Sequence, residues 1–364
     1  MGSQMPPEDE LDRFSEFRMP HVIKRCTEED PLQFYGATIS GSFALILTLS
    51  MCIRQSHVLN GRPLCMQRGY YRGMLFFPMV WAVCCWATLF CPLARPLAEL
   101  FMGQIEAYAI YSFLVILFML VSIEARQRRP NQSDVAMESM QSGDLSNMGL
   151  IVIQAVQDYG PQRYFAVPPL GCFFYRCCKP HHISAKQLLW VSRLVKQFGV
   201  LQIFFNSYFL WARLTLLPAQ ALRVEKISEA VLKVSGVVAM YGLFIMYKAT
   251  HDLLHNWNTT RKFVALKVVI VVSTLQGKLL SWLISSTGLF TTKCLLSKEH
   301  PEDMHRLLTF WSCYFTLLET VVLSLLIIKA FPAHEVTDYP LKNLDLVELE
   351  LRQIDERRSV PSMA

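Results

Sequence analysis

Residues 263–289 form an apolar stretch that carries two lysines, Lys267 and Lys278. The two lie 11 positions apart, about three turns of an α-helix, so a helix places both on nearly one face with Thr274. A charge in the hydrocarbon of a bilayer is costly, and a polar face of this kind usually lines a bundle interior or a watery path. Lys267 lies near one end of the stretch, where its ammonium group can reach water. Lys278, with Gln276 close by, is therefore the candidate intramembrane cation.

The apolar stretch at residues 98–123 carries acidic groups on one helical face. Glu99 and Glu106 are seven positions apart, which places Glu106 about 10 Å deeper than Glu99 at a rise of about 1.5 Å per residue. Tyr108 and Tyr111 add hydroxyl groups on adjacent faces. Glu99 fits a headgroup position. For Glu106, a buried structural hydrogen bond and a role in a solute pathway are both open.

Several charges recur at matching depths in neighbouring apolar stretches. Lys278 and Glu319 each lie about halfway along consecutive stretches, so we expect them to pair near the membrane midplane. Arg213, near the end of another stretch, is in the same way a candidate partner for Glu106. Buried pairs of this kind are equally compatible with a structural role.

Three cysteines lie in a basic, aromatic segment between apolar stretches. Cys172, Cys177 and Cys178 suit S-acylation beside a membrane surface. Together with the adjacent His181 and His182 they make a poor tetrahedral set, so we do not expect a metal site. The alternative is a reduced, unmodified cysteine patch.

Two histidines have the i, i+4 spacing of a zinc-binding helix. His251 and His255 flank an Asp at position 252, where a zinc hydrolase has its general-base Glu, and no third ligand is evident. A solvated helix at the membrane boundary is the favoured interpretation over an intramembrane hydrolase, and neither an enzyme nor a cofactor is expected.

The elements that position these residues are long apolar segments. Of the 364 residues 52% are apolar, too many for an ordinary soluble domain of this size. We expect an all-α membrane protein with seven transmembrane helices of roughly 20 residues or more, at residues 34–53, 71–94, 98–123, 197–217, 230–248, 263–289 and 306–330. The net charge of +6 arises from short loops between spans, so it does not indicate nucleic-acid binding.

The basic residues predict the orientation. Near span ends, seven Lys and Arg residues lie on the side of the N-terminus and fourteen on the other side, and the basic side is cytoplasmic. The N-terminus is therefore expected outside and the C-terminus in the cytoplasm. Residues 1–33 form an extracellular leader, 34–330 the transmembrane domain with a long cytoplasmic loop at 124–196, and 331–364 a cytoplasmic tail.

Several motifs resemble one family of membrane proteins. The segments PLARPLAELFMGQIEAYAIYSFL, YGLFIMYKATHDLL and KFVALKVVIVVSTLQG are similar to the organic solute transporter alpha-subunit family and its seven-helix relatives, and the similarity covers roughly residues 34–350. The resemblance implies seven helices with an outside N-terminus and gradient-driven movement of amphipathic anions such as steroid conjugates and bile acids. It also implies a single-span beta subunit needed for surface delivery, and acylation of a cytosolic cysteine run.

From these features we expect a multi-pass transporter of the plasma membrane, with endomembranes as a further location. The acidic group of the solute would be attracted to Lys278 or Arg213. Hydrogen bonds would come from Tyr108, Tyr111, Asn206, Thr274 and Gln276. No ATP-binding P-loop occurs in the chain, so transport would follow existing gradients. The partners would be membrane lipids and either a beta subunit or a second copy of this chain.

Two other functions are open. A G-protein-coupled receptor is disfavoured, because residues 218–229 lack the expected outer-loop cysteine and the seventh stretch lacks an Asn-Pro-x-x-Tyr run. A non-transporting seven-helix scaffold in trafficking or signalling would suit the long basic, cysteine-rich loop and the acidic tail.

The predicted orientation can be tested through two Asn-X-Ser/Thr sequons. Asn131 and Asn258 both fall in loops predicted to be cytoplasmic, where glycosyltransferases do not act. We expect no change in electrophoretic mobility when the protein from eukaryotic cells is treated with a glycosidase. Glycan on either asparagine would reverse the orientation.

Overall fold

The computed structural model describes residues 31–62, 66–91, 94–128, 153–158, 160–167, 179–215, 218–287 and 302–336. Within these ranges the chain is helical, and the paired backbone outside helices is one isolated antiparallel bridge between Gln162 and His181. Some helical residues, Lys278 and Arg213 among them, have side chains outside the described part.

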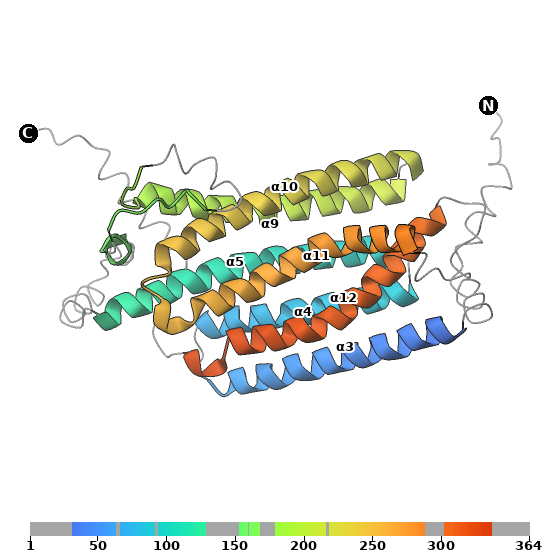
Figure 1. The fold of residues 1–364 in the computed structure, drawn as a ribbon, viewed down its shortest axis with the longest axis horizontal. Helices are drawn as coiled ribbons and strands as arrows, with labels where there is room; N and C mark the ends of the chain where they lie inside the picture. Colours follow the sequence, from blue (N-terminus) through green and yellow to red (C-terminus); the bar gives the residue numbers. More distant parts are fainter. Residues whose placement is uncertain are drawn as a thin grey trace, which may run out of the picture. The chain divides into compact units, whose positions relative to one another are not determined.

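The described part contains seven long helices (Figure 1). They are α3 (Pro31–Asn60), α4 (Met66–Phe90), α5 (Arg95–Arg128), α9 (Ala185–Thr215), α10 (Pro218–Thr250), α11 (Thr259–Thr287) and α12 (Glu302–Ala330). Six of them, all but α11, are long and apolar enough in their described residues to cross a membrane. An all-helical membrane protein is thereby confirmed, while the seventh span and the orientation remain predictions.

Two predicted helix starts are wrong by about three turns. Helix α9 begins at Ala185 rather than at 197, and α10 begins at Pro218 rather than at 230. Apolarity marks only the part of a helix that meets hydrocarbon, whereas polar residues can continue the same helix into water. Proline fits the first position of α10, where its missing N–H has no partner within the helix.

The chain divides into two compact units. The first unit contains Met1–Cys52, Pro78–Glu99 and Lys267–Leu325. The second unit contains Ile53–Phe77, Leu100–Leu266 and Leu326–Ala364. The division therefore passes through α4 at Pro78, whose ring removes one backbone hydrogen bond from the helix.

In the first unit, α3 and α12 are joined by a series of polar contacts. Ser40 Oγ lies 3.1 Å from Tyr314 OH, and Thr48 Oγ1 lies 3.2 Å from Thr320 Oγ1. A third contact of 3.6 Å joins the side chains of Cys52 and Ser324. Residue numbers rise together on both helices, so α3 and α12 run parallel. Short polar side chains of this kind hold helices together where water is absent.

A face of α3 that carries small residues takes part in this contact. A methyl group built on Gly41 would lie 3.7 Å from Leu89 and 3.9 Å from Tyr314, and Ala44 is buried. At Gly41 this face therefore packs against other parts of the same chain.

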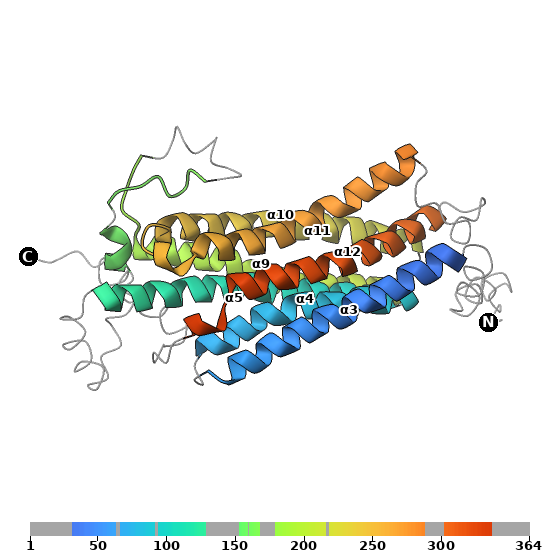
Figure 2. The same ribbon diagram turned by 60° about the horizontal axis from the view of Figure 1, so that its bottom comes forward.

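In the second unit, α9 and α10 form an antiparallel pair that can be followed side by side in Figures 1 and 2. A methyl group on Gly242 would lie 3.3 Å from Leu194, and one on Gly236 would lie 3.4 Å from Phe198. Glycine at these points allows the helices to approach closely. Among the six helices that could cross a membrane, α5 has the largest buried share, and its Phe113 and Leu114 have no exposed surface.

The parallel pairing of α3 and α12 predicts a cross-link. Because the Cys52 and Ser324 side chains are in contact, Ser324→Cys should give a disulfide to Cys52 on mild oxidation, detectable as a linked peptide by mass spectrometry. Ser312→Cys, three helical turns away on α12, is the control that should not link to Cys52. Equal linkage in both variants would contradict the pairing.

Candidate functional site

The second unit contains a close polar contact between α5 and α9. A methyl group built on Gly103 would lie 2.4 Å from Nδ2 of Asn206 and 2.6 Å from Oε1 of Gln202. Asn206 donates a hydrogen bond of 2.7 Å to Gln202 Oε1, and Gln202 is buried. The two amides therefore lie directly on the α5 backbone, in space that only glycine leaves.

Glu106 belongs to the same helix pair. One turn beyond Gly103, the side chain of Ala107 lies 3.9 Å from a methyl group built on Gly199. Glu106 thus lies on α5 between two points of contact with α9, and its side chain is partly buried. The structure brings this predicted residue to the same pair of helices as Asn206.

Two tyrosines extend this polar region toward α4. Tyr108 lies against Gly73, where a built methyl group would come 2.5 Å from its Cε1 atom, and 41% of Tyr108 is exposed. Tyr111 meets Tyr70 edge-on at 6.5 Å between ring centroids. The ammonium of Lys196 lies 5.9 Å from the Tyr111 centroid, within range of a cation–π interaction. Lys196 was not among the predicted site residues, and its contact with Tyr111 depends on the start of α9 at Ala185.

The other predicted pathway residues are not brought to this region by the described contacts. Glu319 lies on α12 in the first unit and is partly buried. Four further side chains lie outside the described part: Arg213, Thr274, Gln276 and Lys278. The predicted pairs Lys278–Glu319 and Glu106–Arg213 therefore remain predictions.

Cys172, Cys177 and Cys178 also lie outside the described residues. The chain that precedes them is fixed to α10 of the second unit. Tyr241 OH donates to the carbonyl of Phe165 at 2.8 Å, and Lys248 Nζ donates to that of Arg163 at 2.7 Å.

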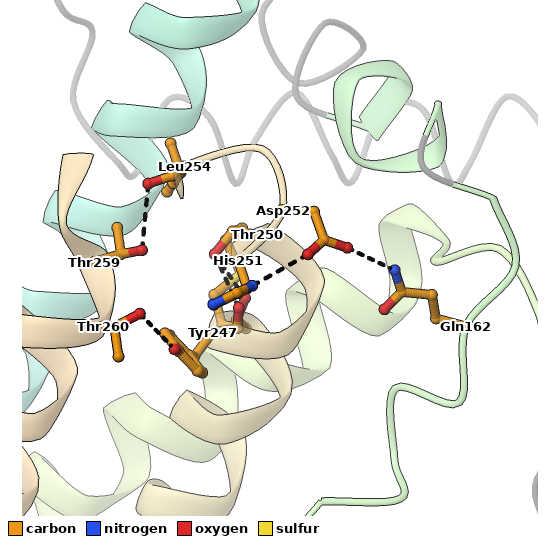
Figure 3. Close-up of polar contacts among 9 residues, drawn as sticks. Gln162, Tyr247, Thr250, His251, Asp252, Leu254, Thr259 and Thr260 are labelled. Carbon is orange, nitrogen blue, oxygen red and sulfur yellow. Dashed lines mark hydrogen bonds and ion pairs between the residues drawn. The ribbon is translucent and has the colours of Figure 1, made fainter. Parts of the chain in front are cut away.

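The two histidines with zinc-helix spacing do not share a helix. Helix α10 ends at Thr250, so His251 lies in a turn, and His255 begins the short 3-10 helix η2 (His255–Trp257). His251 Nδ1 lies 3.1 Å from Asp252 Oδ1, and Gln162 donates to Asp252 Oδ2 at 3.3 Å (Figure 3). The expected helix at 251–255 is wrong, and the described residues contain no cluster of metal-ligating side chains.

The turn after α10 positions Lys262, which was not among the predicted site residues. Thr259, at the start of α11, donates from its hydroxyl to the carbonyl of Leu254 at 3.4 Å (Figure 3). Asn258 adopts a left-handed conformation with φ of 50°, which asparagine tolerates better than most residues. Lys262 then reaches back to donate to the carbonyl of Trp257 at 2.5 Å.

Lys262, in the first turn of α11, forms a buried ion pair within the second unit. Its Nζ lies 2.6 Å from Oε2 of Glu335, and the two side chains are 0% and 10% exposed. Tyr71 OH donates to the same oxygen at 2.9 Å, and Gln67 donates to the Glu335 carbonyl at 3.3 Å. We call Gln67, Tyr71, Lys262 and Glu335 the buried ionic cluster.

A neighbouring hydrogen bond joins α5 to the turn before α11. Trp257 Nε1 donates to Glu124 Oε2 at 2.9 Å, and Glu124 is buried. Neither Lys262 nor Glu335 was among the predicted site residues, and Glu335 lies in the predicted cytoplasmic tail. One feature of the sequence could have indicated that the chain after α12 is buried, namely the apolar residues that follow Ala330. In the structure Phe331, Ala333 and Val336 are buried, although α12 ends at Ala330.

Long apolar helices with polar contacts between them define a multi-span α-helical membrane protein. The chain belongs to the organic solute transporter Ostalpha family, whose model matches residues 36–336. The match includes every member of the buried ionic cluster. This is a family of membrane solute transporters. No curated protein and no solved structure matches the chain.

The tight contact at Gly103 predicts a large effect of substitution. Gly103→Leu would displace the amides of Asn206 and Gln202 and should destabilise the protein by about 1–3 kcal/mol, the usual cost of overpacking. Gly36→Leu is the matched control, because nothing lies within 4 Å of a methyl group there. Thermal unfolding in detergent measures both variants, and equal midpoints would contradict the contact.

Proposed function

We propose that this protein carries amphipathic organic anions, such as steroid conjugates and bile-acid-like solutes, down their gradients across a membrane. The observation that carries the proposal is the family match over residues 36–336. The polar region on α4, α5 and α9 supports it, because Glu106, Tyr111 and Asn206 offer hydrogen bonds within otherwise apolar helices.

An amphipathic anion presents two requirements to a membrane protein. Its hydrocarbon rings need an apolar surface, while its acidic group needs a cation or several hydrogen-bond donors once it leaves water. In this proposal Lys278 and Arg213 supply the cation, and Glu319 sets the charge balance around Lys278. Tyr108, Tyr111, Asn206, Thr274 and Gln276 orient the solute by hydrogen bonds.

The gradient is the energy source in this proposal. The sequence contains no P-loop, the Gly-rich motif that cradles ATP phosphates. Uptake of a labelled steroid sulfate into proteoliposomes should therefore proceed without ATP and without Na⁺. If no organic anion of a panel is taken up, with or without a co-expressed single-span partner, the transport function is contradicted. The non-transporting scaffold would then be favoured.

The proposal includes a cellular setting. The protein lies in the plasma membrane, or in endomembranes, with its N-terminus outside and its C-terminus in the cytoplasm. It works with a single-span beta subunit or as a homo-oligomer, and Cys172, Cys177 and Cys178 are acylated. Copurification with a tagged single-span partner, and hydroxylamine-sensitive labelling of the cysteines by a fatty-acid analogue, test these two points.

Lys278 provides the sharpest test by substitution. Lys278→Gln should lower the uptake rate of a steroid sulfate roughly tenfold, the effect of losing about 1.4 kcal/mol of charge interaction, and should affect an uncharged steroid less. Lys233→Gln is the control, because Lys233 lies exposed on α10 and pairs with Glu229 one turn away. An unchanged uptake rate with normal expression of Lys278→Gln would remove Lys278 from the pathway.

A further inference from the structure

The buried ionic cluster holds an anion in a dry, cationic pocket. Lys262 Nζ and Tyr71 OH both contact one oxygen of Glu335, at 2.6 Å and 2.9 Å. Lys262 Nζ also donates a hydrogen bond of 2.5 Å to the backbone carbonyl of Trp257, which fixes the position of the ammonium group. Neither Lys262 nor Tyr71 has exposed surface, so these donors act where water does not compete and where an unpaired ammonium is costly.

The carboxylate in this pocket comes from a segment outside the long helices. Glu335 closes η3 (Ala333–Glu335), a short 3-10 helix after α12. The same segment presents an apolar ring, because Phe331 meets Tyr71 edge-on at 5.4 Å between centroids. An apolar ring beside an acidic group is also the pattern of an amphipathic organic anion.

We propose that Lys262 and Tyr71 form an anion-binding site, which Glu335 occupies in this structure and which the carboxylate or sulfate of an organic anion occupies when residues 331–336 move away. The choice of anion rests on the proposed function, whereas the site itself rests on the contacts above. In the predicted topology the segments that build it lie on the cytoplasmic side. The site is thus a second cationic position for the solute, distinct from Lys278.

This site makes a prediction that does not depend on transport. Glu335→Ala removes the internal anion and leaves Lys262 buried without its counter-charge, so the full-length protein should unfold at a lower temperature than the wild type. A steroid sulfate should raise this unfolding temperature saturably, since it returns both a negative charge and an apolar ring. The uncharged parent steroid should not raise it.

The double variant Lys262→Met/Glu335→Ala is the matched control, because it has no buried cation to satisfy. Its unfolding temperature should not respond to the steroid sulfate, which separates binding at this site from general effects of an amphiphile. The wild type should respond only at higher concentrations, because Glu335 competes. If Glu335→Ala does not fold, Glu335→Gln provides the same measurement with the volume of the side chain retained.

Two outcomes would overturn the site: no response of either Glu335 variant, or an equal response of the double variant. A rise in unfolding temperature with acetate but not with the steroid sulfate would overturn the amphipathic organic anion as the occupant of the site. Uptake by the wild type is measured separately in proteoliposomes. If the steroid sulfate raises the unfolding temperature of the Glu335 variants but the wild type shows no uptake, the anion site stands and the proposed transport function does not. If the wild type shows uptake but the unfolding temperature does not respond, the transport function stands and the anion site does not.

Discussion

A charge buried away from water needs a counter-charge beside it. The Lys262–Glu335 pair meets this need, and in doing so it holds several segments of the chain together. Through one carboxylate, the starts of α4 and α11 are joined to the chain that follows α12. The backbone carbonyl of Trp257 connects the lysine to the turn before α11, and the Trp257 indole connects that turn to Glu124 at the end of α5. Removing one member would leave another buried and unpaired, which is why such networks hold one arrangement of the chain.

The same reasoning explains how polar side chains are used between the helices. Where the helices meet without water, hydroxyl and amide groups must find partners on the protein. Thr48 and Thr320 do so across α3 and α12, and Asn206 and Gln202 do so on α9. Glycine at position 103 makes room for those amides on α5. The polar region around Glu106 is therefore held by packing between otherwise apolar helices.

Much of the fold could be predicted because hydrophobic length is a local property. Every predicted span coincides with a long helix. The extents of α9 and α10 were not predictable from apolarity, because both helices continue into polar sequence. The helix expected at His251 and His255 failed for a related reason. The i, i+4 spacing has meaning only within a continuous helix, and α10 ends at Thr250.

The sequence by itself determined the class of protein, the approximate helices and the family, because apolar length and ordered motifs are written along the chain. It also selected Glu106 and Asn206 as polar residues within apolar helices. Only the tertiary structure placed them on one pair of helices, and only it joined Lys262 to Glu335 across more than seventy positions of sequence. In the sequence, a lysine just before one apolar stretch and a glutamate just after another look like ordinary loop charges. Their burial follows from how the helix ends pack, which no local pattern records.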